Sequence, residues 1–362
     1  MARPARSRKL TQRNLAAGSK SIVLVAENEP QETKLIRPRS QGGDGLDGLW
    51  NDDFHHTAIV ALTGRAEAYY TDYRGTPQEF ISAAKYGYLY QGQPYMWQEA
   101  PRGTPAFGAP PEAFVCFIEN HDQVANTATG ERLRFQTSPG RYRALTALLL
   151  LGPWTPMLFQ GEEFGSSKRF AYFTDVGDGK LQRTIRNGRF EFLTQFPSIA
   201  NEETQKLLPD PFDPKLVESY HLDFSERETN SEIYELHCDL IRLRRDDSRF
   251  REQIPGSVDG AVLGPASFVL RFFARNSGDR LLVVNLGRQL KLEPAPEPLL
   301  APLSGFEWER VWSSELPKYG GPGEVTVVTQ DNWILPAEAT VALRLVPETA
   351  PRKKPERRRL NG

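Results

Sequence analysis

A polar cluster, Asn120-His121-Asp122, directly follows a short apolar run at residues 113–118. The run is β-prone and is preceded by two prolines, so it predicts a buried and parallel strand. In an α/β barrel, side chains at the carboxyl ends of the strands face the active-site mouth. Three polar groups are costly to desolvate there unless something binds them, which makes the cluster a candidate functional site. The alternative is a simple turn, because the same residue types are typical of a helix cap.

Two further apolar runs also end in carboxylates. Residues 21–26 are followed by Glu27, and Pro30 then stops the strand because proline has no N–H to donate. Residues 156–160 are followed by Glu162 and Glu163. A single strand that ends in a carboxylate is weak evidence for a barrel. Repeated endings of this kind, with helix-length segments between them, favour an α/β barrel.

A fourth short apolar stretch, at residues 46–50, leads into the acidic and histidine-rich segment 51–56. The spacing of Asp52, Asp53, His55 and His56 is not a known zinc arrangement, and no third separated ligand group stands out, so we expect no metal. Capping of a following helix by Asp52 or Asp53 is the favoured interpretation. Binding of sugar hydroxyls by this segment remains an alternative.

The segments between and after these strands divide the chain. Helical spacing predicts helices at residues 57–63, 76–90, 141–151 and 233–246. The proline-rich region 166–230 predicts long loops, which at a barrel mouth usually shape the site. From about residue 250 the pattern changes to short runs typical of a small antiparallel β-sandwich, at residues 267–273, 280–286, 306–312, 325–328 and 339–346.

We therefore expect an α/β protein with four parts. These are a basic segment at 1–20, a partial (β/α)8 TIM barrel at 21–249, a β-sandwich at 250–346 and a disordered basic tail at 347–362. About four strand–helix units are present where a closed barrel needs eight. The chain is thus expected to be the C-terminal half of a barrel, from a truncated reading frame or with a missing partner chain. Its open strand edges predict aggregation.

Composition limits the function. The 362 residues are 39% hydrophobic and 25% charged, with a net charge of −1, which argues against nucleic acid as the partner. No run approaches the roughly 20 apolar residues of a membrane span, and residues 1–20 lack the apolar segment of a secretory leader. Cys116 and Cys238 predict buried thiols in a reducing, cytoplasmic compartment. No cofactor is expected.

Four segments together resemble the α-amylase superfamily, glycoside hydrolase family 13: residues 25–28, 50–56, 117–123 and 156–165. The Asn-His-Asp-Gln sequence at 120–123 indicates only the superfamily. The Trp-Asn-Asp-Asp-Phe-His-His sequence at 50–56 is similar to the malto-oligosyltrehalose trehalohydrolases in particular, over their C-terminal part. The resemblance implies cleavage of the α-1,4 glucosidic bond that releases trehalose from maltooligosyl-trehalose, a step of trehalose biosynthesis.

The resemblance also implies roles for individual residues. Glu27 matches the general acid, Asp122 matches the carboxylate that stabilises the transition state, and His121 matches its sugar-binding neighbour, flanked by Asn120 and Gln123. A retaining glycosidase needs an acid and a carboxylate nucleophile about 5 Å apart. The acid must keep its proton near neutral pH, which a neighbouring carboxylate such as Asp122 promotes by raising its pKa.

The resemblance implies less specific roles for other residues. Asp53 and His56 are expected to line the side that receives the trehalose unit, unless they only start a helix. Glu162 or Glu163 is expected to touch substrate, with Glu163 the preferred candidate, or else to pair with an arginine at the barrel mouth. Arg132 could be that arginine.

The sequence departs from the family at the nucleophile. In the family this Asp lies on the strand before the general acid, but no Arg-x-Asp strand end precedes Glu27. We therefore expect the chain to be inactive alone, with the missing N-terminal half of the barrel as its partner. A branching enzyme or glucanotransferase of the same superfamily, or a non-catalytic glucan-binding remnant, remains an alternative.

Overall fold

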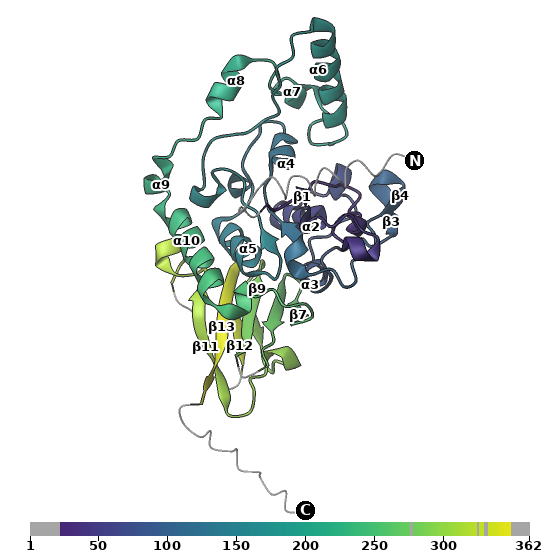
Figure 1. Cartoon of the computed structure of the whole chain (residues 1–362). Coiled ribbons are helices and arrows are strands. Elements are labelled where there is room, and N and C mark those ends of the chain that lie inside the picture. The colour runs from purple at the N-terminus through teal and green to yellow at the C-terminus, as the bar shows by residue number, and fades with distance from the viewer. Residues whose placement is uncertain (1–21, 276–277, 324–325, 329–331, 349–362) are drawn as a thin grey trace, which may run out of the picture.

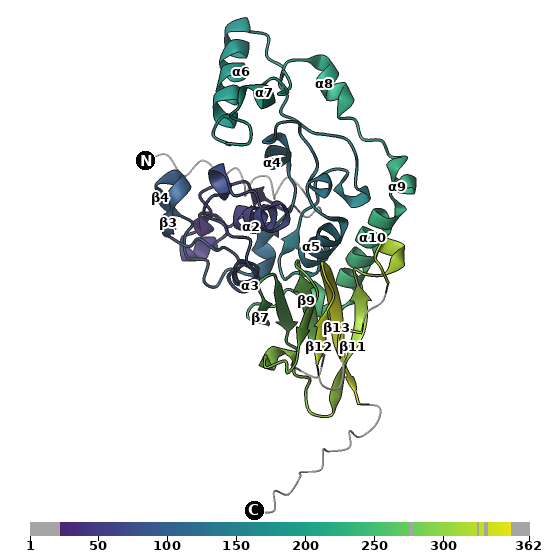
Figure 2. The same cartoon turned by 180° about the vertical axis from the view of Figure 1, so that it is seen from behind.

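The computed structural model describes residues 22–275, 278–323, 326–328 and 332–348. The predicted basic segment at 1–20 and all but the first two residues of the 347–362 tail lie outside the described residues. Figures 1 and 2 show a helical and loop-rich body, with the C-terminal β-strands at one end and α6, α7 and α8 at the other. Within the described part of the chain, no helix is long and apolar enough to cross a bilayer.

Four parallel strands form one sheet, in the order β1-β2-β5-β6. The strands are β1 (Val25–Ala26), β2 (Gly48–Trp50), β5 (Phe114–Cys116) and β6 (Thr155–Pro156). Each is short. Strands β1, β2 and β5 lie within apolar runs predicted to be strands, whereas β6 shares only Pro156 with the run predicted at 156–160. Because all four run in the same direction, their carboxyl ends meet at one edge of the sheet.

Helices cover this sheet. They are α2 (Asp52–Thr63), α3 (Pro77–Tyr86) and α5 (Pro139–Leu151), with the short α4 (His121–Ala125) after β5. The cap of α2 is Asn51, whose side chain accepts a hydrogen bond from the Phe54 backbone N–H at 3.1 Å, so the prediction of a cap at Asp52 or Asp53 was wrong. Helix α3 ends earlier than predicted because Gly87 has a φ of +82°, and a Cβ there would collide with the ring of Phe114.

Two insertions interrupt the succession of strands and helices around the parallel sheet. A hairpin of β3 (Gln93–Tyr95) and β4 (Ala100–Arg102) lies between α3 and β5. The second insertion was predicted to be loops but contains α6 (Gly179–Leu193), α7 (Glu202–Gln205), α8 (Pro214–Ser219) and α9 (Glu226–Thr229). Of the residues of α6, only Leu193 is buried. The chain returns through α10 (Ser231–Asp246) and α11 (Ser248–Arg251).

The C-terminal strands form a five-stranded antiparallel sheet, β11-β13-β9-β8-β7, and a two-stranded sheet, β10-β12. Their bounds are β7 (Val258–Gly264), β8 (Ser267–Phe272), β9 (Arg280–Asn285), β10 (Leu290–Leu292), β11 (Phe306–Ser313), β12 (Trp333–Leu335) and β13 (Ala339–Pro347). Four of the five predicted runs are strands. The run 325–328 is only partly described, and Val328 makes an isolated bridge with Trp333.

Strands β8 and β9 of the five-stranded sheet are buried on both faces. Phe268 and Leu270 of β8 pack into the core of the helical body, whereas Val269 between them packs into the core between the two sheets. The ring of Phe80 on α3 stacks on Phe268, with centroids 5.6 Å apart. The Thr340 hydroxyl also donates to the backbone carbonyl of Ala144 on α5, at 2.8 Å. Tight packing of this kind fixes α3 and α5 under the parallel sheet.

Among the described strands, β1 and β6 are the outer members of the parallel sheet. Val23 and Val25 beside the β1 edge are 71% and 42% exposed. Unpaired, apolar strand edges pair with other chains, so we expect the isolated chain to self-associate. Sedimentation velocity at increasing protein concentration should show this, and the double variant Val23→Lys/Val25→Lys should associate less. A single monomeric species at all concentrations for the unaltered chain would contradict the prediction.

Candidate functional site

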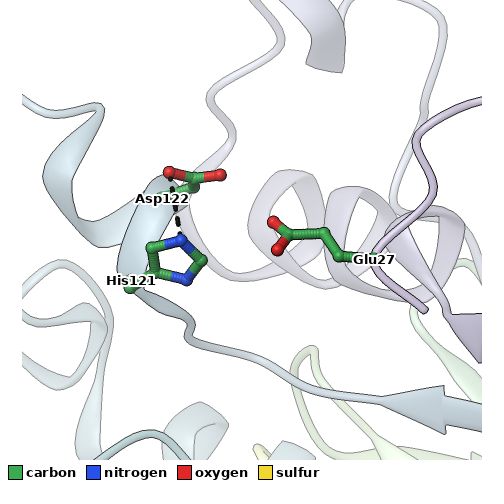
Figure 3. A group of neighbouring side chains, drawn as sticks. All are labelled: Glu27, His121 and Asp122. Carbon is green, nitrogen blue, oxygen red and sulfur yellow. Dashed lines mark ion pairs between the residues drawn. The ribbon is translucent and has the colours of Figure 1, made fainter. Parts of the chain in front are cut away.

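Glu27, His121 and Asp122 gather at the carboxyl ends of two strands. Glu27 directly follows β1, whereas His121 and Asp122 open α4 beyond β5. Potential ligand atoms of the three side chains, one from each, all lie within 4.8 Å of one another. Figure 3 shows Glu27 extending from its own strand toward the other two side chains. Nε2 of His121 lies 3.5 Å from Oδ1 of Asp122. The sequence therefore identified residues that the fold brings together.

The environment of Glu27 favours its protonated form. Partial burial raises the pKa of Glu27, and so do the charge of Asp122 and a hydrogen bond between the two carboxyl groups, while His121 acts in the opposite direction. A carboxyl group with a raised pKa keeps its proton closer to neutral pH. This is the property that a general acid requires.

The side chain of Asn120 fixes the backbone that carries His121 and Asp122. Oδ1 of the buried Asn120 accepts hydrogen bonds from the backbone N–H groups of Asp122, at 3.0 Å, and Gln123, at 2.9 Å. Asn120 is thus the cap of α4, which confirms the helix-cap interpretation of this segment, while its role in a substrate site stays a prediction. The ring of Trp50 meets the His121 ring edge-on, at 5.9 Å between centroids. Sequence reasoning had not given Trp50 this supporting position.

A buried arginine links this segment to the end of β6. Arg132 pairs with Glu119 at 3.2 Å and also donates to the backbone carbonyl of Gln160. Burial, then the charge of Glu119, raises the pKa of Glu162 well above its usual value. Among the described residues the ion pair of Arg132 is therefore with Glu119, and not with Glu162 or Glu163, the alternative considered from the sequence. Contact between the half-buried Glu163 and substrate stays a prediction.

Asp53 is fully buried and holds the hairpin insertion against α2. Its Oδ1 accepts from the Tyr73 hydroxyl at 2.6 Å and from Arg102 Nε at 3.3 Å. Its Oδ2 accepts from the backbone N–H groups of Leu89, at 2.8 Å, and Tyr90, at 2.9 Å. These four bonds occupy the carboxylate, which joins α2 to the insertion instead of facing Glu27.

His56 and Gln123 have surroundings of their own. His56 is 3% exposed and packs among the rings of Tyr69, Tyr70 and Tyr73. Burial holds the pKa of His56 well below its usual value, so the ring is neutral. Gln123 lines a small cavity together with His55. Sugar contacts by His56 and Gln123 stay predictions.

Two residues near the site carried no signal in the sequence. Arg189 of α6 donates to Oδ1 of Asn126, at 2.7 Å, and to the carbonyl of Ala125, at 2.8 Å. It is close enough to Asp122 for the charge of that residue to act on it. Arg102, from the hairpin, lies behind the acidic start of α2. Each is far in sequence from its partners, and only the fold brings them together.

The cluster could also hold a cation, since Glu27, His121 and Asp122 offer one ligand atom each. All three are exposed. Hard divalent cations take six or more oxygen ligands, or a few carboxylates with several waters, so three mixed groups are a weak set for them. The arrangement suits acid catalysis and hydroxyl binding better.

Comparisons with known proteins agree with this geometry. Residues 255–342 match a family described as a domain of unknown function (DUF3459). The chain is 36% identical over 228 residues to malto-oligosyltrehalose trehalohydrolase of Arthrobacter ramosus, covering 62% of this chain and 39% of that protein. It is also 36% identical over 260 residues to the enzyme of that name from Deinococcus radiodurans, covering 68% and 40%. The chain thus spans about two fifths of the length of these curated relatives.

Among solved structures, a putative α-amylase from Salmonella typhimurium matches with a TM-score of 0.72 and 28% identity, over 93% of this chain and 53% of that one. An α-amylase from H. orenii matches with a TM-score of 0.52 and 17% identity, over 94% and 58%. The predicted fold class is confirmed: the C-terminal half of a (β/α)8 barrel followed by a small antiparallel β-sandwich.

Proposed function

We propose that this chain, which resembles the C-terminal part of malto-oligosyltrehalose trehalohydrolases, carries the acid-bearing half of a site that cleaves the α-1,4 glucosidic bond releasing trehalose from maltooligosyl-trehalose. The observation that carries the proposal is the closeness of the Glu27 and Asp122 carboxyl groups, whose potential ligand atoms lie within 4.8 Å of each other, at the ends of parallel strands. A single glucose ring can meet both groups. We also propose a cytoplasmic location, because Cys116 and Cys238 are free thiols.

The two carboxyl groups take different roles. Glu27, whose pKa is raised, donates its proton to the glucosidic oxygen as the bond breaks. Asp122 accepts hydrogen bonds from sugar hydroxyls, and these strengthen as the ring flattens toward an oxocarbenium ion. His121 binds a neighbouring hydroxyl, and the contact of its ring with Trp50 supports this role.

Retaining cleavage needs a further carboxylate as nucleophile. We propose that this group comes from residues outside the present chain, on a barrel strand that pairs with β1. The outer position of β1 among the described strands supports this proposal. The chain alone is then expected to bind the sugar without turning it over.

Sugar binding by Asp122 provides the test. We expect the chain to bind maltotriosyl-trehalose, and Asp122→Ala to weaken binding at least tenfold, because hydrogen bonds to a charged group are worth about 1.5–3 kcal/mol each. Isothermal titration calorimetry measures both. The matched control is Asp246→Asn, which removes an exposed carboxylate 56% accessible at the end of α10 and should leave the affinity unchanged. Equal affinities of the Asp122→Ala variant and the unaltered chain would contradict the proposed site.

Product analysis separates the alternatives. Trehalose released by the isolated chain, and lost in Glu27→Gln, would support the acid role but contradict the need for an outside nucleophile. Preferential action on plain maltooligosaccharide would favour a glucanotransferase or branching enzyme. Binding that neither Asp122→Ala nor Glu27→Ala alters would favour a glucan-binding remnant without a catalytic ancestry in these residues.

A further inference from the structure

Two adjacent aspartates at the start of α2 have opposite surroundings. Asp53 is fully buried, and four hydrogen bonds occupy its carboxylate. The Asp52 side chain keeps 15% of its surface exposed, and its Oδ2 lies 3.6 Å from Nη2 of Arg102, beyond hydrogen-bond distance. Among the described residues no hydrogen bond to its carboxylate is present. Asp52 therefore keeps acceptor capacity that Asp53 has used.

Two buried side-chain nitrogen atoms near the start of α2 also lack hydrogen-bond partners within the described structure. One is Nη2 of Arg102, a side chain that is 1% exposed and whose Nε is bound to Asp53. The other is Nε2 of Gln31, a residue that is 0% exposed and whose Oε1 accepts from the backbone N–H of Asp53, at 3.4 Å. Buried donors without partners are rare, and each calls for an explanation. Here both lie at the N-terminal end of α2.

The N-terminal end of α2 adjoins the cluster of Glu27, His121 and Asp122. The charges of Glu29 and Glu27 both act on the Asp52 carboxyl group. Glu29 in turn accepts a hydrogen bond from the Gln98 side chain, on the tip of the β3–β4 hairpin. The turn that presents Glu27 and Glu29 is strained at Gln31, which has a φ of +54° although it is not a glycine. Strained backbone of this kind persists where the surrounding structure holds it in place.

We propose that Asp52 is a further substrate-binding residue, whose carboxylate accepts hydrogen bonds from the hydroxyls of a pyranose ring next to the glucosidic oxygen that Glu27 protonates. Arg102 and Gln31 are its positioning residues. They contact the start of α2 from its buried side and so hold the Asp52 carboxylate toward the bound sugar. This inference rests on the proposed function and deepens it, because it names the hydroxyl-bearing sugar unit as the group bound. It also assigns the substrate contact to Asp52 instead of Asp53.

Two replacements of Asp52 test the assignment. Asp52→Ala removes the acceptor, whereas Asp52→Asn keeps an oxygen acceptor of the same shape without the charge. Because asparagine keeps the shape of the aspartate, a merely structural role predicts an unchanged sugar affinity for Asp52→Asn. We expect about a tenfold loss of affinity for maltotriosyl-trehalose in Asp52→Ala and about a threefold loss in Asp52→Asn, from the charge-assisted hydrogen bond. Calorimetry on the full chain gives the affinities, with Asp246→Asn as the control.

A spectroscopic measurement accompanies the titration. The side-chain amide signals of Gln31 should shift when maltotriosyl-trehalose binds the unaltered chain, and should shift less in Asp52→Ala. Sugar affinity within twofold of the unaltered chain for both Asp52 variants would overturn the Asp52 assignment and leave the proposed function standing, provided that Asp122→Ala still weakens binding. An unaltered chain that does not bind the sugar would overturn both.

Discussion

Replacing Asp52 by asparagine is expected to stabilise the folded chain at pH 8 and to leave its stability at pH 4 nearly unchanged. Burial, opposed by Arg102 and reinforced by Asp53, raises the pKa of Asp52 from 3.8 to about 7. A shift of this size is worth up to about 4 kcal/mol between the two protonation states, at about 1.4 kcal/mol for each pKa unit. Asparagine has a similar shape and carries no charge at any pH.

The sign follows from the direction of the shift. The folded state holds the Asp52 proton more tightly than the unfolded state, so this group favours folding below pH 4. That contribution is lost as the pH rises from about 4 to about 7, because ionised Asp52 must then be kept in its buried position. Asparagine does not ionise, so Asp52→Asn does not lose stability in this way. The free energy of unfolding of the variant should therefore exceed that of the unaltered chain, and the difference should grow as the pH rises from about 4 to about 7.

Urea unfolding at pH 4, 6 and 8 measures the effect. The exposed variant Asp246→Asn serves as control and should change stability by less than about 0.5 kcal/mol at each pH, as surface substitutions usually do. A constant difference between Asp52→Asn and the unaltered chain at all three pH values would contradict the expected titration.

The stability that Asp52→Asn is expected to gain suggests why an aspartate occupies position 52. A residue that costs stability at neutral pH, beside the proposed general acid, is typical of a site where function and stability conflict. The same carboxylate is the one that we propose to bind sugar hydroxyls. Asp52→Asn should thus be more stable and bind more weakly, a combination that a purely structural residue does not give.

The parallel strands and the catalytic cluster could be predicted because their signals are local. A buried strand is a short apolar run, and residues 113–118 are followed at once by the polar groups that the strand end exposes. Glu27 and Asp122 then meet because β1 and β5 belong to one parallel sheet, with β2 between them. No knowledge of distant packing was needed for this step.

The roles of Asp52 and Asp53 could not be predicted, because distant residues decide them. Adjacent positions on a helix point about 100° apart, and nothing in the local sequence tells which one turns inward. Tyr73, from the segment between α2 and α3, and Arg102, from the β3–β4 hairpin, bind Asp53 and lie 20 and 49 residues further along the chain. Strand β7 escaped prediction for a local reason, because Gly260 and Gly264 interrupt its strand pattern.

Arg102→Met is expected to destabilise the fold by about 3–5 kcal/mol, the usual cost of removing one partner of a buried ion pair. The guanidinium is 1% exposed and lies 3.3 Å from the fully buried Asp53 and 3.6 Å from Asp52. It also lies over the ring of Tyr95, at 5.0 Å from the centroid. Methionine fills much of the same volume but leaves two neighbouring carboxylates without their cation.

A surface arginine provides the matched control. Arg344 pairs with Glu309 at 2.6 Å, but the two side chains are 50% and 48% exposed, so Arg344→Met should cost only about 0–1 kcal/mol. Urea unfolding at pH 7 compares the two variants. Adding Asp53→Asn to Arg102→Met should cost less than the sum of the single changes, because the two residues interact directly. Equal effects of Arg102→Met and Arg344→Met would show that the aspartate pair does not depend on Arg102, and Arg102 would then lose its place as the residue that positions Asp52.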